Sequence, residues 1–407
     1  MAEPTLHTRP TGGAPDADSR GSEPPTETAL DVEVSVRERY AAAAQVREAS
    51  LCCPVDYDPR FLEVIPEDVL ERDYGCGDPS RYVHEGDTVL DLGSGGGKIA
   101  FIAQQKVGPT GRVLGVDTND EMLSLAREAA PVVAERLGYS NVDFLRGRIQ
   151  DLALDVEALD RWLAGSPVRS SADVAELEAE QARLRRERPL VADATIDLVV
   201  SNCVLNLVRE DHKQALIDEI FRVLKVGGRI AISDIVSDEP VPQVLKDDPE
   251  LWSGCVSGAF QEGPLLAAFE QAGFHGIAID QWADEPFAVV GGIEFRSVTI
   301  TAHKGKQGAC DEANQAVLYA GPWKRVEDDD GHVFERGVRT AVSAKTFGLL
   351  TRAPYAGQTI GIEPHVAIAA DQRAPFDCQR SGPRHPSESK GPDSRETHGA
   401  AAGESCC

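Results

Sequence analysis

The stretch Thr88-Val89-Leu90-Asp91-Leu92-Gly93-Ser94-Gly95-Gly96-Gly97, with the run Lys98–Gln105 that follows it, decides the fold. Its first half has the pattern of a short buried strand, its glycines predict a tight turn, and the following run indicates the start of a helix. Glycines are needed where the backbone approaches a ligand closely, because a Cβ would occupy that space. The stretch therefore predicts a strand, a turn and a helix that cradle a cofactor.

The spacing of the glycines excludes two common cofactor patterns. The dinucleotide pattern G-x-G-x-x-G is not met because Lys98 takes its sixth place, and Ile99 replaces the hydroxyl residue that a P-loop requires. A second apolar strand, at 112–116, ends in Asp117. A doubly wound sheet places at this point an acid that binds ribose hydroxyls.

Asp91 before the glycines and Asp117 after the second strand resemble the class I S-adenosylmethionine methyltransferases. The resemblance implies that the first acid lies near the methionine end of the cofactor and that the second binds the ribose. It also implies that the loop after the third strand, 142–145, contacts the adenine. The cofactor-binding residues that follow from it are Asp91, Gly93, Gly95, Gly97, Asp117, Met122, Ile149, Gln150 and Asn202.

The fold class that we predict is α/β, a doubly wound Rossmann-like class I methyltransferase sheet with a smaller C-terminal α+β appendage and disordered ends. Both ends are rich in Pro, Gly, Ser and acids, which bury too little apolar surface to become ordered. The predicted parts are a disordered leader (1–31), an N-terminal helical and cysteine-containing segment (32–87), the methyltransferase domain (88–303), a small C-terminal domain (304–370) and a disordered tail that ends in two cysteines (371–407).

The composition of the chain limits the kinds of partner that it can bind. The 407 residues carry 41 Lys and Arg against 67 Asp and Glu, a net charge of −26, which disfavours nucleic acid because phosphates require a basic surface. No apolar run approaches the roughly 20 residues of a membrane-spanning helix. We therefore predict a cytoplasmic protein without a membrane partner. We expect a monomer, although the sequence itself does not indicate the oligomeric state. In that compartment the nine cysteines are expected as thiols, metal ligands or redox groups rather than a disulfide framework.

Several cysteines occupy positions where a substrate would dock. Cys203 follows the central apolar strand 195–201, and ligands of open α/β sheets lie beyond the carboxyl ends of strands. Cys255 lies on a stretch of small residues, and Cys76 lies between two glycines on accessible backbone. The chain has no C-x-x-C spacing, so a structural zinc site is not supported.

Thiolates select soft, thiophilic centres. A trivalent metalloid takes three sulfurs in a pyramid and keeps a lone pair, which needs no deprotonation before it attacks a sulfonium methyl. The protein then has to supply mainly alignment, because holding two reactants in near-attack geometry removes much of the entropic barrier. Spare thiols can reduce an oxidised pentavalent product by closing a disulfide that another cellular thiol system reopens.

The sequence resembles the arsenite S-adenosylmethionine methyltransferases over roughly 32–303. The matching pieces are Tyr74-Gly75-Cys76-Gly77-Asp78-Pro79, Asp91–Gly97, Ser201-Asn202-Cys203-Val204-Leu205-Asn206-Leu207 and Cys255-Val256-Ser257-Gly258-Ala259. The resemblance implies detoxifying methyl transfer to trivalent arsenic, with glutathione or thioredoxin as reducing co-substrate and a thioredoxin- or glutaredoxin-type reductant as partner.

The same resemblance assigns the thiols. Cys203 and Cys255 match the arsenic-binding pair, and Cys76 matches the third arsenic ligand or a redox partner. One of Cys52 and Cys53 matches the remaining redox cysteine, and the doublet leaves open which one. These five cysteines are the predicted catalytic residues.

Each thiol also has a plainer interpretation, since cysteine is among the most buried residue types and behaves as a small hydrophobe. For Cys310 and Cys378 we favour that interpretation, or a neutral surface thiol. The aromatic residues Tyr40, Trp252 and Phe260 are weaker candidates for lining the methyl-donor pocket, because large aromatics are more often core.

Two rival functions remain from the sequence. One is a methyltransferase of an organic small molecule, which would tolerate the loss of Cys203 and Cys255. The other is a non-catalytic, thiol-based metalloid-binding or sensing protein on a degenerate scaffold. The intact Asp91–Gly97 loop argues against a degenerate scaffold, and the lack of a basic or helix-turn-helix segment argues against a DNA-binding sensor.

Overall fold

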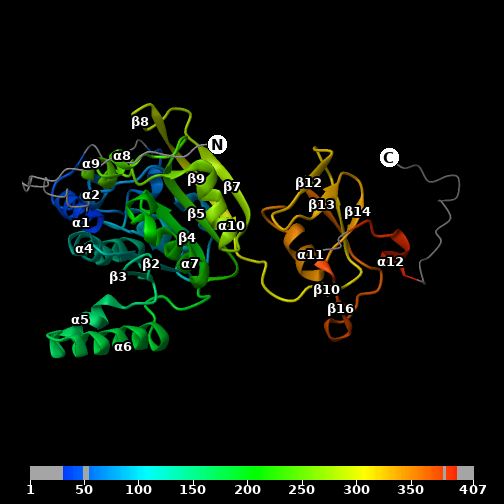
Figure 1. Cartoon of the computed structure of the whole chain (residues 1–407), viewed down its shortest axis with the longest axis horizontal. Coiled ribbons are helices and arrows are strands. Elements are labelled where there is room, and N and C mark those ends of the chain that lie inside the picture. The colour runs from blue at the N-terminus through cyan, green and yellow to red at the C-terminus, as the bar shows by residue number, and fades with distance from the viewer. Residues whose placement is uncertain (1–30, 49–54, 379–381, 392–407) are drawn as a thin grey trace, which may run out of the picture.

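The computed structural model describes residues 31–48, 55–378 and 382–391, and Figure 1 shows two bodies that follow one another along the chain. The first is an α/β body with a central sheet. The second, smaller body is built mainly from short strands. Within the described ranges, no helix is long and apolar enough to cross a membrane.

The central sheet has the strand order β3-β2-β1-β4-β5-β9-β7. Its members are β3 (Val142–Arg146), β2 (Arg112–Asp117), β1 (Thr88–Leu92), β4 (Ile196–Asn202), β5 (Leu224–Ser237), β9 (Ile293–His303) and β7 (His275–Trp282). The first five strands are parallel, and β9 is antiparallel to both of its neighbours. The short strands β6 (Phe260–Gln261) and β8 (Ala288–Val290) pair with β5 and β9. The predicted class I methyltransferase sheet is confirmed.

Helices cover both faces of this sheet, because successive residues of a strand point to opposite sides. Val89 of β1 packs with α2 (Glu67–Glu71), α3 (Lys98–Val107) and α4 (Asp120–Leu137). Its neighbour Leu90 packs with α7 (Lys213–Val223) and α10 (Glu262–Gln271) on the other face. The glycine pair 227–228 lies inside β5.

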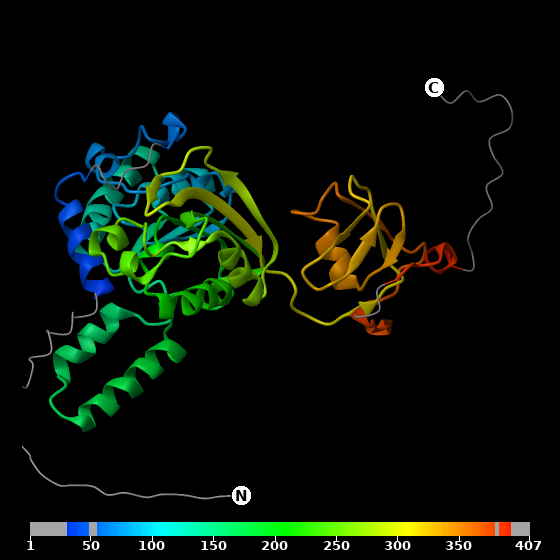
Figure 2. The ribbon, with the colours of Figure 1, turned by 45° about the horizontal axis from the view of Figure 1, so that its top comes forward.

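Further helices complete the first body. The insertion between β3 and β4 forms a hairpin of α5 (Val156–Gly165) and α6 (Ser171–Glu187), which projects from the sheet (Figure 2) and begins its second helix with a capping box. Near the carboxyl edge lie α1 (Val32–Ala43) and the short α8 (Gln243–Lys246) and α9 (Pro249–Ser253).

The C-terminal body centres on β11 (Ala316–Tyr319), which pairs with β14 (Arg339–Ala341) and β15 (Thr359–Ile362). Two further pairs are β12 (Arg325–Glu327) with β13 (Val333–Glu335), and β10 (Asp311–Glu312) with β16 (Ala374–Pro375). The run 345–350 belongs to helix α11 (Ala344–Leu350), whose N-terminus is capped by Ser343 through a hydrogen bond from the N–H of Thr346 at 3.1 Å.

The predicted start of the disordered tail at residue 371 is too early. Residues of that segment form β16 and α12 (Pro386–Lys390), and Arg384 is buried with its guanidinium on both carboxylate oxygens of Glu312, at 2.9 and 2.8 Å. The polar composition of this segment predicted disorder, but an ion pair rather than apolar burial holds the segment in place. The leader predicted at 1–31 lies outside the described residues except for Asp31, which caps α1.

Two disulfides join described residues, Cys76 to Cys203 and Cys310 to Cys378. The interpretation of Cys310 and Cys378 as small buried residues or neutral surface thiols is therefore wrong, whereas the ligand and redox roles expected of Cys76 and Cys203 stay predictions. Sequence spacing could not reveal the pairs, whose members lie 127 and 68 residues apart. Cys52, Cys53 and the terminal pair Cys406-Cys407 lie outside the described residues.

We predict that Arg384→Ala destabilises the C-terminal body by about 2–3 kcal/mol, because it leaves Glu312 without its charge-assisted hydrogen bonds. Thermal unfolding followed by near-ultraviolet circular dichroism measures the change. Arg352→Ala, at an exposed position, is the control and should leave the unfolding temperature unchanged. Equal unfolding temperatures for both variants would contradict the buried ion pair.

Candidate active site

The glycine loop after β1 lies against the loop after β4, because these two strands are parallel neighbours. Gly93, Gly95 and Gly97 all have left-handed backbone, with φ of 65°, 50° and 93°. A Cβ on Gly93 would lie 2.5 Å from a methyl of Val204, the residue after Cys203. Glycine is therefore required here both for its conformation and for the close approach of the two loops.

Two carboxylates flank this loop, that of Asp91 buried and that of Asp117 half-buried. Asp117 accepts hydrogen bonds from the N–H of Gly95 at 2.9 Å and of Asn119 at 2.8 Å, and burial raises its pKa. Asp91 is 2 % exposed, and among the described residues its Oδ2 has no hydrogen-bond partner. Burial, and then the charges of Asp73 and Asp117, raise the pKa of Asp91 well above its usual range.

An orphaned buried carboxylate oxygen needs a donor, preferably a cationic one. S-adenosylmethionine carries an ammonium group and a sulfonium, and the glycine loop leaves backbone space that side chains would fill. The residues present therefore fit this cofactor at the carboxyl edge of β1 and β2. The hydroxyl of Ser94, also buried without a partner among the described residues, adds a second polar group at the same place.

The other predicted cofactor residues lie around this loop or near it. Met122 is buried, with its sulfur 4.0 Å from the position of a Cβ on Gly95, and it packs beneath Ala43 and Ala44 of α1. Ile149 is buried in the apolar layer that contains α7, and Gln150 is half-buried beside it.

Asn202, which is predicted to contact the cofactor, holds the loop around Cys76 in the structure. Its amide oxygen accepts from the N–H groups of Cys76 and Gly77 at 2.9 and 3.1 Å, and its amide nitrogen donates to the carbonyl of Gly77 at 2.9 Å. The same nitrogen lies 3.3 Å from the hydroxyl of Tyr57. The side chain of Asn202 thus clamps the Cys76 loop, a distant contact that the sequence does not reveal.

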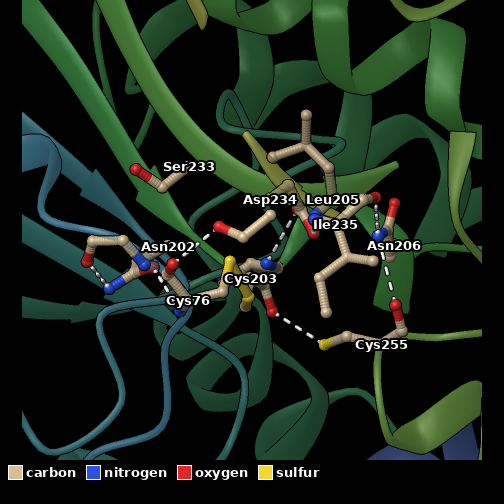
Figure 3. Close-up of a disulfide and its surroundings, with 12 residues drawn as sticks. Cys76, Asn202, Cys203, Leu205, Asn206, Ser233, Asp234, Ile235 and Cys255 are labelled. Atoms are coloured by element: carbon tan, nitrogen blue, oxygen red, sulfur yellow. Dashed lines mark hydrogen bonds between the residues drawn. A yellow bond between two sulfur atoms is a disulfide. The ribbon is translucent and has the colours of Figure 1, made fainter. Parts of the chain in front are cut away.

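This clamp brings together the three cysteines predicted to bind arsenic (Figure 3). Cys76 and Cys203 are joined with a Cα to Cα distance of 5.9 Å, and the thiol of Cys255 donates to the carbonyl of Cys203 at 3.0 Å. All three are buried. Cys203 and Cys255 both have left-handed backbone, with φ of 59° and 62°. Non-glycine residues in this region occur preferentially at functional sites.

Two polar residues that sequence analysis missed hold these cysteine loops. The carboxylate of Asp234 accepts from the N–H groups of Val204 at 3.1 Å, Leu205 at 2.8 Å and Ile235 at 2.8 Å. The amide of Asn206 donates to the carbonyls of Ile235 at 2.6 Å and Cys255 at 3.3 Å. The available signal was an acid directly after an apolar strand pattern, at the edge where the ligands converge.

Helix α1 covers the cysteines from the side. The hydroxyl of Tyr40 lies 3.9 Å from the thiol of Cys255, and its ring packs edge-on against Tyr74. These two rings line a small cavity with Cys203, Cys255 and Phe287. Burial, and then the charge of Cys255, raise the pKa of Tyr40 well above its usual range, so the phenol stays protonated.

Comparisons with known proteins divide the chain into the same two parts as the structure does. Residues 83–176 and 168–273 match the family model described as a methyltransferase domain, and residues 306–394 match a domain of unknown function. An arsenite methyltransferase of Aquipseudomonas alcaligenes is 32 % identical over 80 % of this chain and 86 % of its own length. The human arsenite methyltransferase is 27 % identical over 72 % of each chain.

A solved structure agrees with these relatives. The X-ray structure of an arsenic (III) S-adenosylmethionine methyltransferase from Chlamydomonas reinhardtii superimposes with a TM-score of 0.52 and 27 % identity, covering 80 % of this chain and all of that one. Fold, glycine loop and carboxylates define a class I S-adenosylmethionine-dependent methyltransferase. Within that class, the chain belongs to the arsenite methyltransferase family.

We predict that ionisation of Asp234 makes the stability of the α/β body depend on pH. Burial raises the pKa of Asp234 from 3.8 to about 6, so the folded state favours the neutral acid. Its stabilising contribution is complete below pH 3.8 and is lost as pH rises through about 6. The loss amounts to about 3 kcal/mol, because one pKa unit corresponds to about 1.4 kcal/mol.

Denaturant unfolding of the wild type and of Asp234→Asn between pH 4.5 and pH 7.5 measures this effect. The wild type should lose stability relative to the variant, which carries no ionisable group at this position, as the pH rises. Parallel stability curves for the two proteins would contradict the prediction.

Proposed function

We propose that this arsenite methyltransferase holds trivalent arsenic on the thiolates of Cys203, Cys255 and Cys76 during methyl transfer from S-adenosylmethionine. The observation that carries the proposal is the convergence of three cysteines from separate segments, two of them with left-handed backbone, beside the glycine loop. Soft thiolates are the ligands that a thiophilic metalloid prefers. A role in arsenic detoxification follows from this activity.

The cofactor would lie over the glycine loop, with Asp91 facing its ammonium group and Asp117 near the ribose. When bound, S-adenosylmethionine supplies an electrophilic methyl group whose leaving group is a neutral thioether. Met122 supports the loop from below, and Gln150 is the polar candidate for an adenine contact.

Alignment is the main contribution of the protein. The contact between Gly93 and Val204 fixes the spacing of the cofactor loop and the cysteine loop. Asp234 and Asn206 hold Cys203 and Cys255 through backbone groups. Ordering both reactants in this way removes much of the entropic cost of bringing them together. The chemistry requires no general base, and the protonated Tyr40 beside Cys255 supplies none.

The disulfide between Cys76 and Cys203 represents, in our proposal, the oxidised form of the site. Two thiols that close a disulfide release two electrons and two protons, the number that pentavalent arsenic needs to return to the trivalent state. Both sulfurs must be reduced again before they bind arsenic. We propose that a thiol reductant of the glutathione or thioredoxin class carries out this reduction, with Cys52 or Cys53 relaying the exchange. We also propose that the enzyme is monomeric and cytoplasmic.

The two rival functions lose their support. Family membership favours arsenite over an organic acceptor, and the glycine loop with its two carboxylates favours turnover over simple metalloid binding.

We predict that Cys203→Ser abolishes arsenite-dependent release of S-adenosylhomocysteine, with at least a hundred-fold loss, because a hydroxyl is a poor ligand for a soft centre. The release is measured on purified protein with S-adenosylmethionine, a thiol reductant and either arsenite or no acceptor. Binding of S-adenosylmethionine, followed by calorimetry, should persist in the variant.

Cys310→Ser is the matched control, since it removes a cysteine from the C-terminal body, and it should retain turnover. Turnover that does not depend on Cys203 would favour an organic acceptor. Tight arsenite binding without turnover in the wild type would favour the binding protein.

A further inference from the structure

A second pair of cysteines lies far along the chain from the candidate active site. Cys310 precedes β10 and Cys378 follows β16, and their Cα atoms are 6.7 Å apart. Both residues are half-buried, so reagents in solvent can reach them. Neither the family relationship nor the proposed mechanism uses this pair.

The two cysteines are held opposite one another by contacts that do not involve sulfur. Strands β10 and β16 pair through the register Asp311 to Pro375, and the N–H of Phe376 donates to the carbonyl of Cys310 at 2.8 Å. On the other side, the ring of His332 contacts the carbonyl of Cys378 at 2.7 Å. Opening the disulfide therefore leaves two thiols already facing each other.

The buried ion pair strengthens this conclusion. Arg384, six residues beyond Cys378, is 3 % exposed at its side chain and binds both carboxylate oxygens of Glu312, two residues beyond Cys310. The chain on either side of the pair is thus anchored independently of the sulfur–sulfur bond, through β10 with β16 and through Glu312 with Arg384. A preorganised dithiol binds a bridging ligand without first having to order its own backbone.

We propose that the reduced Cys310–Cys378 pair is a second binding site, specific for trivalent arsenicals with at least two exchangeable hydroxyl groups. This inference stands apart from the assignment of the active-site thiolates. A dithiol reductant first opens the disulfide and is itself oxidised. The two thiols then form two As–S bonds, and their protons leave with the two displaced hydroxyls as two water molecules.

The charge of the arsenical and its number of exchangeable groups determine which species the second site binds. Asp311 lies beside the pair, and the chain carries a net charge of −26, so the electrostatic field repels anionic arsenate but not neutral trivalent arsenic acids. An arsenical with two organic substituents has one exchangeable group and cannot bridge two thiols. The site therefore accepts arsenite and singly methylated arsenic, and it leaves the doubly methylated species free.

The test counts arsenic on the full chain. Protein reduced with a phosphine is titrated with phenylarsine oxide, which has two exchangeable positions, and adducts are counted by native mass spectrometry. Cys310→Ser/Cys378→Ser should bind one arsenic fewer per chain than the wild type. The single variant Cys378→Ser should show the same loss of one, because the bridge needs both sulfurs.

Equal stoichiometry in the wild type and the double variant would overturn the proposal. If a variant fails to fold, peptide mapping of the wild type decides instead. Bound phenylarsine oxide should protect Cys310 and Cys378 together from iodoacetamide, whereas dimethylarsinous acid should not bridge them. Full alkylation of both cysteines in the presence of phenylarsine oxide would overturn it.

Activity separates this site from the active site. Arsenite-dependent release of S-adenosylhomocysteine should be the same in the double variant and in the wild type. A fall to the level of Cys203→Ser would place the pair in the catalytic relay and would overturn the proposal of a separate site.

Discussion

The side-chain amide of Asn202 is the contact on which the geometry of the cysteine site depends. It lies at the carboxyl end of the central strand β4 and uses both its oxygen and its nitrogen on the backbone around Cys76. A Cβ on Gly75 would lie 2.2 Å from the amide nitrogen, so the loop can reach this position only without a side chain there. A buried amide that loses such partners costs about 1–3 kcal/mol per unsatisfied group. Close packing against the side chain of Asn202 thus explains the glycine at position 75 in the pattern Gly75-Cys76-Gly77.

In the loops that carry the cysteines, hydrogen bonds from neighbouring side chains offset the strain of the backbone. Cys203 and Cys255 occupy a backbone region that costs a non-glycine residue about 1–3 kcal/mol, and such conformations persist only where the surroundings fix them. Asp234 and Asn206 provide this support through hydrogen bonds to the neighbouring backbone. The thiols are therefore aimed by backbone geometry rather than by side-chain rotamers alone, which suits a ligand that needs several sulfurs at fixed spacing.

Much of this arrangement was predictable because it depends on periodicity along the chain. The strands β1 and β4, the glycine loop and the cysteines beyond their ends followed from apolar runs and from the rule that ligands bind at carboxyl ends. The family followed from the motifs around Cys76, Cys203 and Cys255.

What sequence could not supply were contacts between distant segments. The clamp by Asn202 spans more than a hundred residues, and the ordering of the segment around Arg384 depends on an ion pair with Glu312. Polar composition alone made that segment look disordered. Asp234 was overlooked because its role is to accept hydrogen bonds from three backbone N–H groups, and such contacts leave no motif in the sequence.

The acidity of the proposed cofactor crevice would let one site bind the methyl donor more tightly than the demethylated product. Asp91 is buried and Asp117 is half-buried, and desolvation raises the pKa of both carboxyls. A cofactor that carries a sulfonium and an ammonium group would supply positive charge and make ionisation of these acids less costly. Once the methyl group has left, the sulfonium charge is gone, and part of this attraction would go with it. In the proposed site, the acids that draw in the methyl donor would therefore hold the demethylated product less strongly.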